Sequence, residues 1–270
     1  MTGMATAATP AAPAGPDWGT LAAIALVAGA LTTLLHEGVG HGGACWLSGG
    51  HNLVVSSVNE ECSVANPWIS AAGTLVNFAA GGVFFGLGRR ARHPHLRYFL
   101  WLAMVFNLLS AAGYWLFSGV LGVGDWADLL AGLQPAWLWR TGMALGGAAV
   151  YVVLVRLVAW ELKPLLPRDT QGRVARARRL MLVPYFAHGV LSCIAGLFNP
   201  VGAVLIAESA AAASFGGASG LCWGWQFVRQ GYFAQPGREL GPLTRNWGWI
   251  AAGVVAAGLF IGVLGPGLRT

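Results

Sequence analysis

Long apolar runs separated by short polar segments dominate this chain. Seven of these runs approach or exceed the roughly 20 residues that a helix needs to cross a bilayer. They lie at 18–46, 68–87, 98–123, 141–162, 180–198, 201–223 and 247–264. The pattern predicts an all-α integral membrane protein with about seven transmembrane helices, six being the alternative count.

Two segments break this pattern. Residues 1–17 are rich in Ala, Pro, Gly and Thr and predict a disordered N-terminal tail. They lack the basic start of a secretory signal peptide, so we expect the first apolar run to remain in the mature protein. Residues 51–67 contain the β-forming side chains of Val54, Val55 and Val58, which predict a short hairpin or loop at the membrane surface.

Composition supports the membrane assignment. Of 270 residues, 56% are hydrophobic and only 10% are charged, and the mean hydropathy is +0.61. The net charge of +6 does not predict a nucleic-acid partner, because the basic residues gather in the connections between apolar runs. The arginine-rich connections follow the second, fourth and sixth runs, at 89–97, 163–179 and 226–246.

The positive-inside rule orients the chain. It places these arginine-rich connections in the cytoplasm, the N-terminus inside and the C-terminus outside. We expect a multi-pass protein of a bacterial inner membrane.

The end of the first run carries the candidate chemistry. His36, Glu37 and His41 follow a long apolar stretch, and ionisable groups at membrane depth indicate function. In zinc hydrolases two imidazoles of one helix hold the metal, and a carboxylate between them takes a proton from water. The alternative is a pair of helix-end histidines bonded to neighbours, with Glu37 at the membrane surface.

The two histidines are five residues apart, whereas the common zinc motif spaces them by four. Five residues of an α-helix rotate the second side chain about 140° away from the first. We therefore expect a π-turn, which the glycines at 38, 40, 42 and 43 would accommodate. Soluble two-lobed dipeptidyl peptidases have the same His-Glu-x-x-x-His spacing.

Other polar side chains within the apolar runs are candidates for the same site. Asn77 interrupts the second run and predicts either a hydrogen bond between helices or a role at the site. Asp125 follows glycines at the end of the third run, where it could approach the metal or cap the segment 126–133. His188 and Glu208 lie deeper, and they either pair with each other or assist the site.

Two cysteines flank the first polar connection. Cys45 and Cys62 would close a loop of about seventeen residues if that connection faces an oxidising compartment. Two free thiols are the alternative.

The motifs resemble those of the site-2 protease family, which are membrane-embedded zinc metalloproteases. In that family one helix carries His-Glu-x-x-His, a second carries a Gly-Pro-x-x-Asn-like segment, and a later helix end supplies an Asp. Here the first motif corresponds to His36, Glu37 and His41, the second to Gly73-Thr-Leu-Val-Asn77, and the third to Gly124-Asp125.

The chain departs from the family pattern at three points. It has one extra residue between the histidines, Thr74 stands where proline is usual, and Asp125 lacks a surrounding Asn-Pro-x-x-Asp-Gly. The resemblance covers roughly residues 21–128. It implies a metalloprotease-like membrane core at 18–128, and the apolar runs that follow predict C-terminal membrane helices at 129–270.

The resemblance also implies residue roles. His36, His41 and Asp125 would bind Zn²⁺, Glu37 would be the general base, and Asn77 would orient the substrate. The implied partner is a membrane-spanning or membrane-adjacent polypeptide in the lipid bilayer.

Two alternative functions remain open. The first is a zinc-dependent lipid hydrolase, to whose site His188, Ser192 and Glu208 would contribute. The second is a non-enzymatic transporter or accessory protein.

Overall fold

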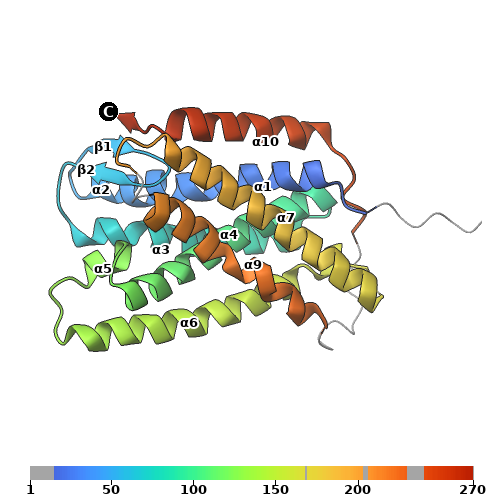
Figure 1. Cartoon of the computed structure of the whole chain (residues 1–270), viewed down its shortest axis with the longest axis horizontal. Coiled ribbons are helices and arrows are strands. Elements are labelled where there is room, and N and C mark those ends of the chain that lie inside the picture. The colour runs from blue at the N-terminus through green and yellow to red at the C-terminus, as the bar shows by residue number, and fades with distance from the viewer. Residues whose placement is uncertain (1–14, 168, 203–205, 230–239, 270) are drawn as a thin grey trace, which may run out of the picture.

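The chain folds into a bundle of long helices with a small sheet at one end (Figure 1). The computed structural model describes residues 15–167, 169–202, 206–229 and 240–269, without the side chains of 206–209. Six of the described helices are long and apolar enough to cross a membrane. The predicted all-α membrane fold is therefore confirmed.

The first half of the chain supplies three of these helices and most of the sheet. Helix α1 (Trp18–Thr33) continues through a π-helical segment, η1 (Leu34–Gly42), into α2 (Gly43–Leu47). Strands β1 (Asn52–Val55) and β2 (Glu60–Cys62) then form the predicted hairpin. The elements that follow are α3 (Pro67–Arg90), α4 (Pro94–Leu121) and the short α5 (Asp125–Leu129).

The second half adds the remaining helices. They are α6 (Ala136–Glu161), η2 (Lys163–Leu165), α7 (Thr170–Leu197), η3 (Ile206–Gly216), η4 (Gly217–Ser219), α9 (Gly220–Trp223), η5 (Gly224–Arg229), α10 (Trp247–Leu259) and η7 (Phe260–Leu264). Strand β3 (Leu268–Arg269) pairs antiparallel with β1 and completes a sheet of order β2-β1-β3. The sequence pattern did not predict this third strand.

Side-chain caps fix where several helices begin. Asp17, Asn66, Asp169 and Asn246 each accept a hydrogen bond from a backbone N–H in the first turn of α1, α3, α7 and α10. Helix α7 therefore begins at Thr170, inside the segment predicted to be a basic loop. Its arginines occupy a polar extension of the apolar helix, which helical geometry permits once Asp169 caps it.

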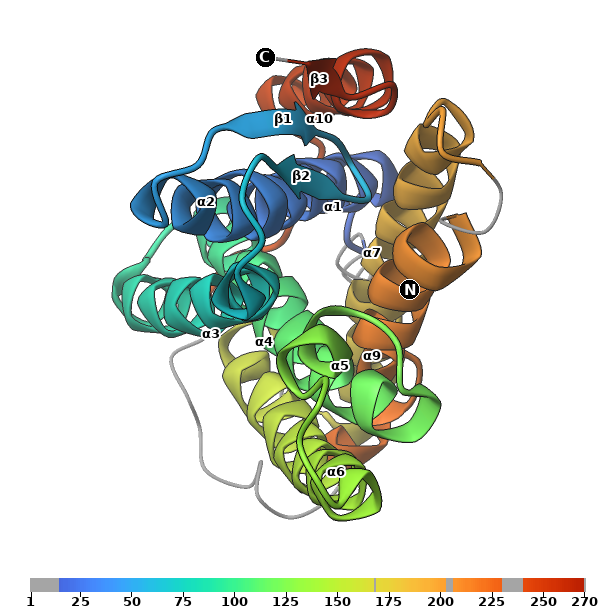
Figure 2. The ribbon, with the colours of Figure 1, turned by 90° about the vertical axis from the view of Figure 1, so that its left-hand side faces the viewer.

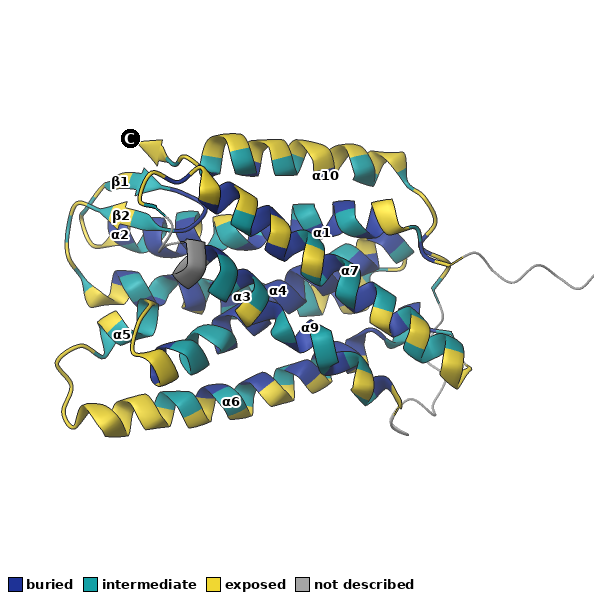
Figure 3. Cartoon of the chain, in the orientation of Figure 1, coloured by how far each residue is buried: buried dark blue, intermediate teal, exposed yellow. Residues whose placement is uncertain are grey.

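The two halves share one hydrophobic core around α4. Its main cluster contains side chains from Leu21 in α1 to Leu243 before α10. The segments 18–128 and 129–270, which the sequence separates, therefore pack together. Figure 2 shows α4 surrounded by its neighbours, and Figure 3 shows that its residues are mostly buried whereas α6 and α10 expose one face. Such apolar outer faces are typical of helices that contact lipid.

The bundle has two chemically different ends. At the sheet end, Ser57 N–H donates to the carbonyl of Leu264. At the other end, which we call the arginine end, Asp17 binds Arg245, and Arg97 forms a buried ion pair with Glu161 at 2.7 Å. The start of α1 thus lies at the arginine end and β3 at the sheet end (Figure 1). Because these two points lie at opposite ends, the chain between them must run along the bundle an odd number of times. The segment predicted as a sixth span, 201–223, is described in part, as η3 to α9, and it runs back toward the arginine end.

The structure joins Cys45 and Cys62 in a disulfide that connects α2 to β2. We therefore expect mass spectrometry of the denatured, alkylated protein to find two modified thiols without reductant, on Cys193 and Cys222, and four with it. Closing a loop of this length limits the unfolded chain and is worth roughly 3 kcal/mol. Four modified thiols without reductant would contradict the bridge.

Candidate metal centre

The π-helical segment η1 brings the two histidines together. Its i→i+5 hydrogen bonding places residues five apart on nearly the same face, which an α-helix does not do. The Nε2 atoms of His36 and His41 lie 3.1 Å apart, and both side chains are buried. The predicted local loosening of the helix is confirmed, although it spans nine residues rather than a single turn.

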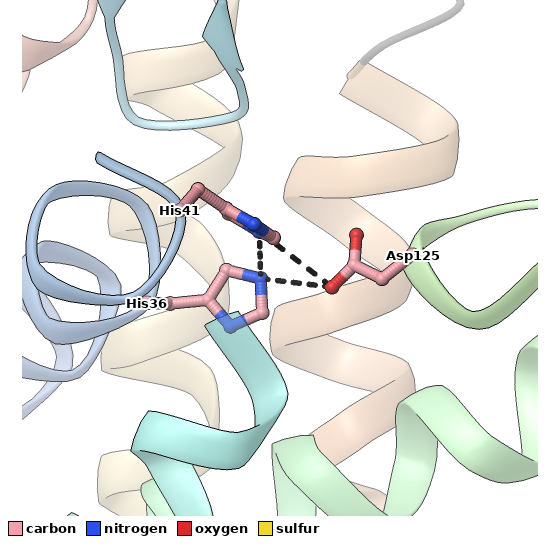
Figure 4. Close-up of side chains that lie close together, drawn as sticks. All are labelled: His36, His41 and Asp125. Atoms are coloured by element: carbon pink, nitrogen blue, oxygen red, sulfur yellow. Dashed lines mark hydrogen bonds and ion pairs between the residues drawn. The ribbon is translucent and has the colours of Figure 1, made fainter. Parts of the chain in front are cut away.

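Asp125 reaches the histidines from the far side of the site (Figure 4). Gly122 ends α4 in the left-handed region at φ 72°, and Gly124 precedes α5 at φ 84°. These two conformations, which favour glycine, turn the chain back toward η1. Asp125 Oδ2 then lies 3.2 Å from His36 Nε2 and 3.7 Å from His41 Nε2, while Asp128 remains exposed.

The contact made by Nδ1 of the His41 ring indicates which ring nitrogen carries a proton. Nδ1 lies 2.7 Å from the carbonyl oxygen of Ile69, which can only accept a hydrogen bond. Nδ1 therefore carries a proton, and the Nδ1–H tautomer of the ring has a lone pair on Nε2, which faces His36 and Asp125. A metal cation between the two Nε2 atoms and Asp125 Oδ2 would satisfy all three of them.

The ligand atoms have separations that suit zinc. Bond lengths of about 2.0–2.1 Å from zinc to nitrogen or oxygen imply about 3.3 Å between ligand atoms in a tetrahedral site. The observed separations are 3.1, 3.2 and 3.7 Å. Asp125 Oδ2 is buried and has no hydrogen bond of acceptable geometry within the described residues. These three side chains could therefore hold a metal ion, and two histidines with one carboxylate form a known donor set of catalytic zinc.

Close backbone packing between η1 and α3 leaves space for the rings. A Cβ at Gly40 would lie 2.5 Å from the Cα of Gly73, so the two backbones touch. A Cβ at Gly73 would lie 2.5 Å from His41 Nε2 and 2.8 Å from His36 Cε1. Gly73 therefore forms the floor of the candidate centre.

Glu37 lies beside the ligand set without joining it. Its side chain is buried and lines a 230 Å³ polar cavity at the sheet end, together with Glu60, Asp125 and Asp128. Burial raises the pKa of the Glu60 carboxyl at the rim of this cavity. Through this cavity water can approach Glu37 and Asp125 together.

Asn77 contacts the other histidine. Its amide nitrogen lies 3.2 Å from His36 Nδ1, and its Oδ1 is buried with no partner among the described residues. Rotating the amide by 180° exchanges these two atoms, so Oδ1 then accepts a hydrogen bond from His36 Nδ1–H. That tautomer leaves the lone pair of His36 Nε2 free for a metal. Asn77, predicted to orient substrate, thus lies where it can set the state of a ligand.

A second, smaller cavity connects the site to His188. Its volume is 40 Å³, room for about three water molecules. It is lined by His36, Glu37, Asn77, His188 and Ser192, among other polar residues. Ser57 also lines it, and Ser57 Oγ and His188 Nδ1 are buried without a hydrogen-bond partner in the described part of the chain. Bridging waters would satisfy both atoms.

The structure places two of the three predicted accessory residues near the site. His188 and Ser192 face this cavity, close to the site but outside the ligand set, and the His188 ring packs on Phe106 with centroids 4.4 Å apart. The side chain of Glu208 lies outside the described part of the structure, so its pairing with His188 stays a prediction.

The sequence pattern did not single out two residues at the site, Tyr114 and Trp126. The Tyr114 ring stacks on His36 with centroids 5.0 Å apart. Trp126 Nε1–H donates to Thr74 Oγ1 at 2.6 Å, which holds α5, and hence Asp125, against α3. Thr74 is the residue that replaces the proline of the family pattern. An aromatic residue in an apolar run gives no signal of such a role, because most are simply core.

Comparisons of this chain with protein-family models, curated proteins and solved structures find no match.

We predict that Gly73→Ala abolishes metal binding, because the added methyl group would occupy the space of the two rings. Gly82→Ala is the matched control, since it lies in the same helix and a Cβ there meets nothing within 4 Å. Zinc per protein, measured on monodisperse purified samples, should fall only for Gly73→Ala. Full zinc occupancy in Gly73→Ala would contradict this geometry.

We predict that Asn77→Leu lowers zinc affinity roughly 10–100-fold, as loss of a ligand's hydrogen-bond partner commonly does. Asn77→Asp keeps an acceptor for His36 Nδ1–H and should retain affinity. Asn107→Leu is the control, because Asn107 is equally buried but donates to Thr32 and Ala103. Competition with a chromogenic zinc chelator gives the affinities, and equal values for Asn77→Leu and wild type would exclude this role.

Proposed function

We propose that this chain is a membrane-embedded zinc hydrolase that cleaves peptide bonds in or next to the bilayer. One observation carries the proposal. Three metal-competent atoms from η1 and α5 converge within 4.8 Å of one another, beside an acidic side chain in a water-accessible cavity. Buried ionisable groups in a membrane-spanning bundle are costly, and catalysis at a metal accounts for all four together.

The proposed roles follow from position. His36, His41 and Asp125 hold the zinc ion, while Asn77 and the Ile69 carbonyl orient the two imidazoles. Bound zinc lowers the pKa of water toward about 7 and polarises a carbonyl group. The Glu37 carboxylate accepts a proton from the attacking water and then donates it to the leaving amine nitrogen.

The sheet favours a peptide as substrate. Strand β2 pairs with β1 on one side and lies at the edge of the sheet within the described residues. Its Glu60 lines the same cavity as Glu37 and Asp125. An extended polypeptide can add to such an edge through main-chain hydrogen bonds. This would position a scissile peptide bond next to Glu37.

A lipid hydrolase is the second candidate, and a different cavity favours it. An almost wholly apolar cavity of 420 Å³ lies between α4, α6 and η3, and Tyr114 separates it from the candidate centre. It could take an acyl chain as well as an apolar side chain of a polypeptide.

We expect purified wild-type protein to contain about one tightly bound zinc ion. Glu37→Gln should retain it, because Glu37 is a base and not a ligand, whereas Asp125→Ala should lose most of it. Hydrolysis of casein in detergent should fall about 10²–10⁴-fold in Glu37→Gln.

Other results of these assays would overturn parts of the proposal. Wild-type protein without bound zinc would favour a non-enzymatic transporter or accessory protein. Equal zinc loss in Glu37→Gln would make Glu37 a ligand. Release of fatty acid from phospholipid vesicles, without casein cleavage, would replace the protease by a lipid hydrolase.

A further inference from the structure

A second feature lies at the arginine end, far from the candidate centre. A groove of 1040 Å³ runs along the outer face of α7 toward the start of α1 and the end of η5. Its polar end is formed by Arg178, Arg179 and Arg229, and its apolar wall by Trp18, Leu182 and Phe186. We call this feature the arginine groove.

The carboxylates described at this end have other partners. Asp17 binds Thr20 and Arg245, Glu161 binds Arg97, and Asp169 caps α7. Within the described residues, none of the ion pairs involves the three groove arginines. The Arg179 guanidinium lies over the Trp18 ring at 5.3 Å, which keeps its charge at the groove. The polar end therefore attracts an anion.

The apolar wall continues from these arginines toward the middle of the bundle. Eight residues separate Arg178 from Phe186, which corresponds to about 12 Å along a helix. One leaflet of a bilayer contributes about 15 Å of hydrocarbon. Phe186 is 56% exposed, and Val190 continues the same apolar face one turn further. A free inorganic anion would make no use of this wall.

We propose that the arginine groove binds an anionic phospholipid of the leaflet at that end. The phosphate lies among the guanidinium groups of Arg178, Arg179 and Arg229, and an acyl chain follows Leu182, Val183 and Phe186. Arginine suits this task because its planar guanidinium group donates several hydrogen bonds to phosphate oxygens while staying charged. Basic pockets between membrane helices are known to bind lipid headgroups in this way.

Native mass spectrometry of the detergent-purified protein tests the proposal. With phosphatidylglycerol and phosphatidylcholine added at equal concentration, phosphatidylglycerol should bind preferentially. The double variant Arg178→Gln, Arg179→Gln should lower its affinity roughly ten- to thirty-fold, which corresponds to about three- to fivefold for each arginine. Arg90→Gln with Arg92→Gln removes the same charge from the same end outside the groove, and should leave the affinity unchanged.

Three results would overturn the proposal. These are equal binding of both lipids to wild type, equal loss of binding in the two double variants, and displacement of phosphatidylglycerol by equimolar inorganic phosphate. A monodisperse gel-filtration profile serves as the folding control, and the groove shares no residue with the candidate centre. The lipid result and the metal result can therefore fail independently of each other.

Discussion

The contact on which the candidate centre depends is the one between two backbones, at Gly40 of η1 and Gly73 of α3. A side chain at Gly40 would press against the backbone of α3, and a side chain at Gly73 would press against the two histidine rings. The π-helical geometry of η1 then aligns the His36 and His41 rings, and the absence of a side chain at Gly73 gives both rings their space. Small residues allow helices in membranes to approach this closely.

The bundle places different chemistry at its two ends. The sheet end combines the carboxylates Glu37, Glu60 and Asp125 with a disulfide and a polar cavity. The arginine end has a buried Arg97–Glu161 ion pair and the arginine groove. Between them, α4 fills the core with apolar side chains and one buried amide, Asn107, that donates to Thr32 in α1. Few polar groups interrupt this middle layer, as the low dielectric of a membrane demands.

Support for the three candidate ligands comes from groups that are distant in sequence. The Ile69 carbonyl fixes the tautomer of His41, and Asn77 contacts His36 from about two turns further along α3. Trp126 holds α5 through Thr74, so a departure from the site-2 protease pattern has a structural use here. Metal ligands depend on such partners for orientation and basicity. In this chain the supporting residues are drawn mainly from α3, which carries none of the three candidate ligands.

The sequence determined the fold class, most helix positions and the residues of the candidate centre, because apolar length and isolated ionisable groups are local signals. Tertiary structure decided how they meet. The extent of η1, the return of Asp125 past Gly122 and Gly124, and the pairing of β3 with β1 each depend on contacts between distant segments. The same holds for the polar extension of α7 and for Tyr114 and Trp126, whose side chains resemble ordinary core residues in sequence. Local periodicity has no information on which neighbour a side chain will face, because packing of the whole bundle selects that neighbour.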